Sequence, residues 1–249
     1  MMNGVLAIIP GITITTIIGY ISIWISDYIG INILGFEKSP ISSVMVAIVM
    51  GILISNIFEL SHIFQKGINF AVKKILKFGI ILLGIRLSII EVLRLGMTGI
   101  PIVIICIIGG ITVAVIFAKW MNLPRNLGIL IGVGTSICGV SAIVAAGPSI
   151  NAKKEEITYA IAVITVFGIF ATILYPYIVN FLFAGDPVKA GLFLGTSIHD
   201  TSQVTGAGLL YAEVFNQQIT LDVAVVTKLV RNVFMVIMIP LMSFLAKKT

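Results

Sequence analysis

Charged side chains are scarce in this sequence. Aspartate, glutamate, lysine and arginine make up 10% of the 249 residues, whereas a soluble domain carries about 25%. Hydrophobic residues make up 59%, and the mean hydropathy is +1.16. Apolar runs of about 20 residues, long enough to cross a bilayer as helices, recur along the chain. These features exclude an ordinary soluble domain and predict an all-α integral membrane protein.

Residues typical of metal, cofactor or nucleotide chemistry are also few. The only two cysteines, Cys106 and Cys138, lie far apart in apolar segments, so no disulfide framework or zinc-ligand spacing is present. No Walker A loop occurs, which gives no support to an ATP-driven pump. The net charge of +6 comes mainly from basic residues between apolar runs, where they orient a membrane protein. We therefore expect no metal, no cofactor and no nucleic-acid partner.

About eight hydrophobic segments are predicted, and together they form a single transmembrane domain over residues 1–249. Each is about 20 residues long, which suffices to cross the hydrocarbon core as a helix. The predicted segments are 5–26, 41–58, 78–95, 98–118, 127–150, 157–180, 188–211 and 219–246.

Residues 59–77 form the most polar stretch between these segments. Polar and charged residues from Glu59 to Lys77 recur there at spacings of three and four, which predicts an amphipathic helix on the cytoplasmic membrane surface. If all eight segments cross, this placement leaves nine basic residues inside and four outside, with both termini cytoplasmic. The inside set is Lys66, Lys73, Lys74, Lys77, Lys119, Arg125, Lys189, Lys247 and Lys248, and the outside set is Lys38, Arg94, Lys153 and Lys154.

A short repeat links two of the segments. The stretches GTSICGVSAIVAAG (134–147) and GTSIHDTSQVTGAG (195–208) agree at seven of fourteen positions with a constant offset of 61. Glycine weakens a helix, and paired interruptions near the midplane are typical of transporter binding sites. We predict breaks near 135–139 and 196–200. The two segments are either crossing broken helices or re-entrant hairpins. The hairpins would place ten basic residues inside and three outside. Close packing by small residues, without any interruption, is the remaining explanation.

Five titratable residues fall at similar depth inside predicted segments. They are Arg86, Lys228, Arg231, His199 and Asp200. Buried charges in a membrane usually face the protein interior and mark a pathway, although a structural pair or an interfacial position would also explain them. With His199 neutral their charges sum to +2, and this surplus favours an anion.

The predicted site therefore combines hydroxyls, cations and a proton-carrying pair. His199 and Asp200 are the candidates for proton or ion coupling. The predicted substrate-binding residues are Thr135, Ser136, Cys138, Thr196, Ser197, Gln203, Arg86, Lys228 and Arg231.

Four stretches resemble a known family. LLGIRLS (82–88), GVGTSICGVSAI (132–143), GTSIHDTSQVTGAG (195–208) and VVTKLVRNVFM (225–235) are similar, in order and spacing, to the YeiH-type sulfate exporter family of bacteria and archaea. The resemblance implies a secondary transporter of the inner membrane, distantly related to sodium/proton antiporters, with sulfate or a related sulfur oxyanion as substrate. Members of that family continue for roughly three more spans, so the chain is expected to be shorter than its relatives.

Several functions compete at this point. The leading one is a secondary anion exporter driven by a proton or sodium gradient, with membrane lipid and a second copy of the chain as partners. A cation/proton antiporter using Asp200 is the alternative. An intramembrane enzyme built on Cys138 and His199 has less support, because cysteine in an apolar helix usually serves packing. A purely structural membrane protein would not need five charges at one depth.

Overall fold

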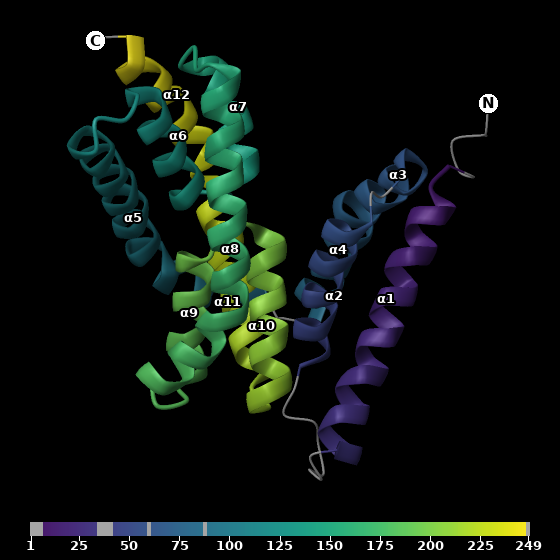
Figure 1. Ribbon diagram of the computed structural model, residues 1–249. Helices are drawn as coiled ribbons and strands as arrows, with labels where there is room; N and C mark the ends of the chain where they lie inside the picture. The colour runs from purple at the N-terminus through teal and green to yellow at the C-terminus, as the bar shows by residue number, and fades with distance from the viewer. Residues whose placement is uncertain (1–6, 34–41, 59–60, 87–88, 248–249) are drawn as a thin grey trace. The chain divides into compact units, whose positions relative to one another are not determined.

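The computed structural model describes residues 7–33, 42–58, 61–86 and 89–247, and in these ranges every regular element is a helix (Figure 1). Within these ranges, four stretches are long and apolar enough to cross a membrane: Ile9–Ile33, Gly99–Trp120, Lys154–Leu182 and Gln218–Met242. Ser43–Ile57 and Val140–Ser149 are shorter apolar helices. The predicted all-α membrane class is confirmed. The chain divides into two units, residues 1–86 with 209–216 and residues 87–208 with 217–249.

The first unit is built from α1 to α4. α1 (Ile9–Asp27) ends in a π-helical turn (Tyr28–Ile33), and α2 (Ser43–Ile57) follows. α3 (His62–Phe70), a π-helical turn (Ala71–Ile75) and α4 (Leu76–Arg86) then form one uninterrupted helical stretch. At the start of α2, the Glu213 carboxylate accepts hydrogen bonds from Ser42 Oγ at 2.7 Å and from the Ser43 amide at 3.2 Å. A carboxylate at a helix N-terminus is electrostatically favourable.

The predicted amphipathic segment 59–77 is helical over its described part. Residues 59–60 lie outside the described residues, and among residues 61–79 only Gly67 is buried. Gly67 is buried because α1 crosses there: a Cβ added to Gly67 would collide with the Ile8 carbonyl oxygen and lie 2.5 Å from Gly11 Cα. The two glycines therefore let two helix backbones touch.

The predicted boundary between segments 78–95 and 98–118 is wrong. α5 runs without a break from Ile89 to Trp120. Gly96 and Gly99 are packing positions in the second unit: their added Cβ atoms would lie 3.5 Å from Val230 Cγ2 and 3.7 Å from Thr227 Oγ1. Small residues at these positions allow α5 to approach its neighbour closely.

The rest of the second unit consists of seven further helices, of which α10 gives its last residues to the first unit. They are α6 (Arg125–Ser136), α7 (Val140–Ser149), α8 (Lys154–Leu182), α9 (Pro187–Ser197), α10 (Thr201–Phe215), α11 (Gln218–Val233) and α12 (Met235–Lys247). The predicted segment 219–246 is thus two helices joined at Phe234. Apolar side chains from α5 to α8, among them Ile107, Leu130, Ile143 and Ile164, form its main core.

Asp186 fixes the start of α9. Its carboxylate accepts hydrogen bonds from the amides of Val188 and Lys189, both at 3.0 Å, and Pro187 occupies the first helical position. The pKa of Asp186 lies below its ordinary value for two reasons. The larger is the hydrogen bond from the Lys189 amide, and the second is the Lys189 ammonium 3.1 Å away. The sequence pattern Asp-Pro thus marks a capped helix start.

We expect Asp186→Ala to lower the melting temperature of the purified protein by a few degrees, because α9 loses its cap. The depressed pKa means that the stabilisation is present above the unfolded carboxyl pKa near 4 and is lost as pH falls through the lower, folded value. Thermal unfolding of wild type and variant over a pH series measures this difference. Equal melting temperatures at neutral pH would contradict it.

Candidate functional site: two opposed helix hairpins

Both GTSI segments are interrupted where the repeat predicts it. α6 ends at Ser136 and α7 begins at Val140, whereas α9 ends at Ser197 and α10 begins at Thr201. Gly139, in the first break, has φ +68° and ψ −126°, a backbone conformation that side-chain-bearing residues rarely adopt.

The first break reverses the chain. A Cβ on Gly134 would lie 2.7 Å from the Ile143 side chain, although nine residues separate the two positions. In a continuing helix nine residues would place them about 13 Å apart. α6 and α7 therefore fold back on each other, and we call residues 125–149 the first hairpin.

The second break also reverses the chain, as the directions of its two helices relative to α11 show. α9, which precedes the break, runs parallel to α11. A Cβ on Gly191 would lie 2.6 Å from Val223, and one on Gly195 would lie 2.7 Å from Thr227. Residue numbers increase together along the two helices, which defines their common direction.

α10 runs the opposite way along α11. Asn232 Nδ2 donates to Thr201 Oγ1 at 3.1 Å, whereas a Cβ on Gly208 would lie 2.8 Å from Leu221. Since α9 and α10 have opposite directions relative to α11, they also form a hairpin. We call residues 187–208 the second hairpin.

The tips of the two hairpins meet inside the second unit. A Cβ on Gly139 would lie 3.5 Å from the Asp200 nitrogen and 3.5 Å from the His199 carbonyl carbon. In Figure 1, α6 and α7 occupy one end of this unit and α9 starts from the opposite end. Of the two geometries that the sequence allowed, the structure has hairpins, and crossing broken helices are wrong.

Lys228 joins the two tips. Its ammonium donates to the Ile137 and Ile198 carbonyl oxygens, both at 2.9 Å, and also to the His199 carbonyl oxygen. The side chain is fully buried. All three ammonium hydrogens therefore have carbonyl acceptors, contributed by both hairpins.

Arg231, also fully buried, makes a second bridge one helical turn along α11. Its Nε donates to the Ile137 carbonyl oxygen at 2.8 Å and one terminal nitrogen donates to the Thr135 carbonyl oxygen at 2.5 Å. The other terminal nitrogen donates to the Thr196 carbonyl oxygen. These carbonyls end α6 and α9, where the helix dipole carries partial negative charge, so both cations are matched to helix C-termini.

This bonding corrects the sequence interpretation of Lys228 and Arg231 as direct anion ligands. They lie deep and on one face, as predicted, but the donors described above are directed at the protein's own backbone. Depth and spacing are visible in a sequence, whereas free backbone carbonyls are not.

Asp200 serves as the cap of α10. Its carboxylate accepts from the Ser202 amide at 2.8 Å and from Ser202 Oγ at 2.5 Å, and Gln203 Oε1 accepts from the Asp200 amide at 3.2 Å. The bond to Gln203 is one half of a capping box, and the Asp200 carboxylate caps the Ser202 amide. Asp200 and Gln203 thus shape the second tip, and Asp200 remains partly exposed there.

The repeat places two serines at equivalent positions with different surroundings. Ser197 Oγ donates to Phe193 O at 2.6 Å, and Thr196 Oγ1 likewise bonds Leu192 O at 2.8 Å. Ser136 Oγ is buried and has no hydrogen-bond partner among the described residues. The hydroxyl hydrogens of Thr196 and Ser197 are therefore used within α9, while that of Ser136 is available.

Three further polar atoms near the tips are buried without a partner: His199 Nδ1, Thr227 Oγ1 and Asn232 Oδ1. Buried polar atoms without partners are rare in native proteins and call for an explanation. The sequence interpretation missed Thr227 and Asn232. The available signal was their position, since Thr227 precedes Lys228 and Asn232 follows Arg231 on the same helix.

The other predicted residues are placed as follows. Cys138 lies in the first tip, buried, with its Sγ 3.4 Å from Met235 Sδ. Arg86 ends α4 in the first unit, and its side chain lies outside the described residues.

Comparison with known proteins places the chain in a membrane protein family. A family model described as conserved hypothetical protein 698 matches residues 10–249. A UPF0324 membrane protein of Streptococcus agalactiae is 37% identical over 224 residues, which cover 90% of this chain and 64% of the relative. One of Fusobacterium nucleatum is 39% identical over 208 residues, covering 83% and 58%. The chain thus spans 58–64% of the length of these relatives. Their names state a membrane location and no substrate, and no solved structure matches the chain.

Proposed function

The chain belongs to the UPF0324 family of membrane proteins, and from its two opposed hairpins we propose that it acts in secondary transport of a small anion. The observation that carries this proposal is the meeting of the two tips, at residues 137–139 and 198–200, within the second unit. Non-helical backbone at membrane depth is tolerated only where protein buries it or where it lines a cavity. Paired interruptions of opposite direction are typical of transporter binding sites.

The distribution of helix ends supports an anion as substrate. Lys228 and Arg231 neutralise the negative ends of α6 and α9, and α7 and α10 begin at the same tips with their positive ends. Asp200 caps α10, whereas α7 has no side-chain cap. The uncapped start of α7, four residues after Ser136 in the same tip, is the better candidate for an oxyanion.

The resemblance to sulfate exporters supplies the substrate class, sulfate or a related sulfur oxyanion. Coupling to protons or sodium is proposed because the chain has no Walker A loop. His199 is the coupling candidate, since its Nδ1 is buried without a partner at the tip.

The distribution of basic residues between the two ends of the second unit supports an orientation in the membrane. Lys119, Arg125, Lys153 and Lys154 lie near the ends of α5, α6 and α8 that meet at one end of the second unit, and Lys189 lies at the other end. We propose that the end with more cations is cytoplasmic in the inner membrane.

Asp200 keeps a cation/proton antiporter as the second candidate. It is a carboxylate at the tip, partly exposed, with its amide and carboxylate held by Gln203 and Ser202. Protonation would remove the ionised acceptor at the start of α10, and this would couple proton binding to the tip geometry.

Uptake into proteoliposomes tests these proposals. We expect radiolabelled sulfate to accumulate only when a pH or sodium gradient is imposed, and collapse of the gradient to abolish accumulation. Sodium uptake driven by a pH gradient, without sulfate uptake, would support the antiporter. Absence of both activities would contradict secondary transport of these ions.

Ser136→Ala is expected to reduce sulfate affinity about tenfold or more, because a hydrogen bond to a charged group contributes about 1.5–3 kcal/mol. Its melting temperature should be unchanged or higher, since the variant removes an unpartnered buried hydroxyl. Thr172→Val is the matched control: Thr172 Oγ1 is buried but donates to Gly168 O at 2.7 Å, and its loss should leave affinity unchanged. Equal affinities in wild type and Ser136→Ala would remove this serine from the site.

A further inference from the structure

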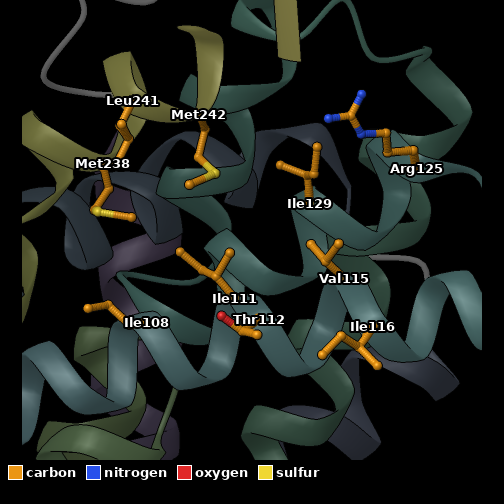
Figure 2. Close-up of a pocket in the computed structure, with 10 residues that line it drawn as sticks. All are labelled: Ile108, Ile111, Thr112, Val115, Ile116, Arg125, Ile129, Met238, Leu241 and Met242. Carbon is orange, nitrogen blue, oxygen red and sulfur yellow. The ribbon is translucent and has the colours of Figure 1, made fainter. Parts of the chain in front are cut away.

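An apolar groove lies in the second unit. It has a volume of about 420 Å³ and lies between α5, α6 and α12 (Figure 2). Its wall includes Ile108, Ile111 and Ile116 of α5 and Met238 and Leu241 of α12. Among the lining residues that the structure describes, Arg125 alone is charged. The groove is therefore a long apolar surface with a single cation.

Arg125 lies at one end of the groove. α5 and α6 run in opposite directions, since an added Cβ on Gly128 would lie 2.5 Å from Ala118 and one on Gly132 would lie 3.1 Å from Ile111 Cα. Arg125 precedes Gly128 and so lies beyond the level of Ala118, while Ile108 marks the opposite end.

The length of the groove matches one leaflet of a bilayer. The ten residues between the levels of Ile108 and Ala118 correspond to about 15 Å along α5. Half of the roughly 30 Å hydrocarbon thickness is also about 15 Å. A chain seated here with its polar end at Arg125 would extend from the membrane surface to the midplane.

The charge of Arg125 is free for a ligand. Its side chain is exposed, and within the described part of the chain no carboxylate lies at ion-pair distance from it. Arg125 is also the first residue of α6, where the helix dipole is positive. An anionic group at this position meets favourable charge and no competing acid.

We propose that this groove binds an anionic phospholipid, with one acyl chain against Ile108, Ile111 and Met238 and the phosphate at Arg125. Guanidinium binds phosphate in two-point fashion, and a basic residue near a headgroup contributes about 1 kcal/mol, or about fivefold in affinity. The lipid site is independent of the transport proposal, because it lies on other residues and is assayed without substrate.

The test is a titration of the purified, full chain in detergent with dioleoyl phosphatidylglycerol, followed by native mass spectrometry. We expect one saturable lipid, bound about fivefold more tightly than dioleoyl phosphatidylcholine. Arg125→Gln should abolish that preference. Lys119→Gln, the matched control, removes an exposed cation near the same end that does not line the groove, and should keep the preference. Ile108→Trp, which fills the inner end of the groove, should weaken the binding of both lipids.

Three outcomes would overturn the proposal. If Arg125→Gln and Lys119→Gln lost the preference for the anionic lipid equally, the binding would be only a diffuse attraction to a basic surface. Unsaturable binding, or equal affinity for both lipids in wild type, would show a non-specific detergent-like layer. A groove occupied by a second copy would appear as a dimer whose formation Ile108→Trp prevents without changing lipid binding. Melting temperatures within a few degrees of wild type confirm that the exposed substitutions leave the fold intact.

Discussion

Arg231→Met is expected to reduce the free energy of unfolding by about 2–6 kcal/mol. Removal of the guanidinium leaves the Thr135 and Thr196 carbonyl oxygens without this donor, and each unsatisfied buried group costs about 1–3 kcal/mol. The Ile137 carbonyl oxygen retains its bond from Lys228. Denaturant unfolding in mixed micelles, followed by far-ultraviolet circular dichroism, measures the loss.

Two companion variants make the result specific. Arg231→Lys keeps the charge but lacks the planar fork, so it should recover only part of the stability. Lys189→Ala removes an exposed cation whose ion pair with Asp186 is at the surface, and should change stability by less than about 1 kcal/mol. If Arg231→Met unfolds at the same denaturant concentration as wild type, the carbonyls have found other donors and the bridge between the tips is dispensable.

In the first unit, the same chemical change is expected to have opposite signs at two glycines. Gly67→Ala should destabilise the protein by about 3 kcal/mol, the upper part of the usual range for overpacking, because the new methyl group would meet Gly11 backbone atoms of α1 at 2.5–2.7 Å. Gly19→Ala has nothing within 4 Å of the new methyl group. It should stabilise the helix by up to about 1 kcal/mol.

Thermal unfolding of both variants beside wild type provides the measurement, with Gly51→Ala as a second open position. A higher melting temperature for Gly67→Ala would contradict the close contact between α1 and α3. A lower one for Gly19→Ala would mean that this helix face is covered by something that the described residues do not supply.

The breaks in the GTSI segments could be predicted from sequence, but the direction of the chain after each break could not. Crossing helices and hairpins need the same local features, namely glycine and hydroxyl residues at the interruption. The direction is decided by contacts across the break between residues that are not neighbours in the sequence, such as Gly134 with Ile143. No periodicity within either segment records such a contact.

The buried cations were likewise only partly predictable from the sequence. The spacing of Lys228 and Arg231 correctly predicted a shared helix face, since both side chains are buried and bond the Ile137 carbonyl oxygen. Their acceptors are carbonyl oxygens at Ile137, Ile198 and Thr196, which every residue type possesses and which only a helix end exposes. The acidic side chains in the sequence therefore do not reveal the partners of these two cations.

The bridging of both tips by one helix has a consequence for the order of membrane insertion. On its own, α11 would bring Lys228 and Arg231 into lipid at about 2.5–3.5 kcal/mol each. The residues that accept their hydrogen bonds, from Thr135 to His199, all precede α11 in the chain. They are synthesised first, so α11 leaves the ribosome when its docking site already exists. Integration of α11 is thus expected to depend on the two preceding hairpins.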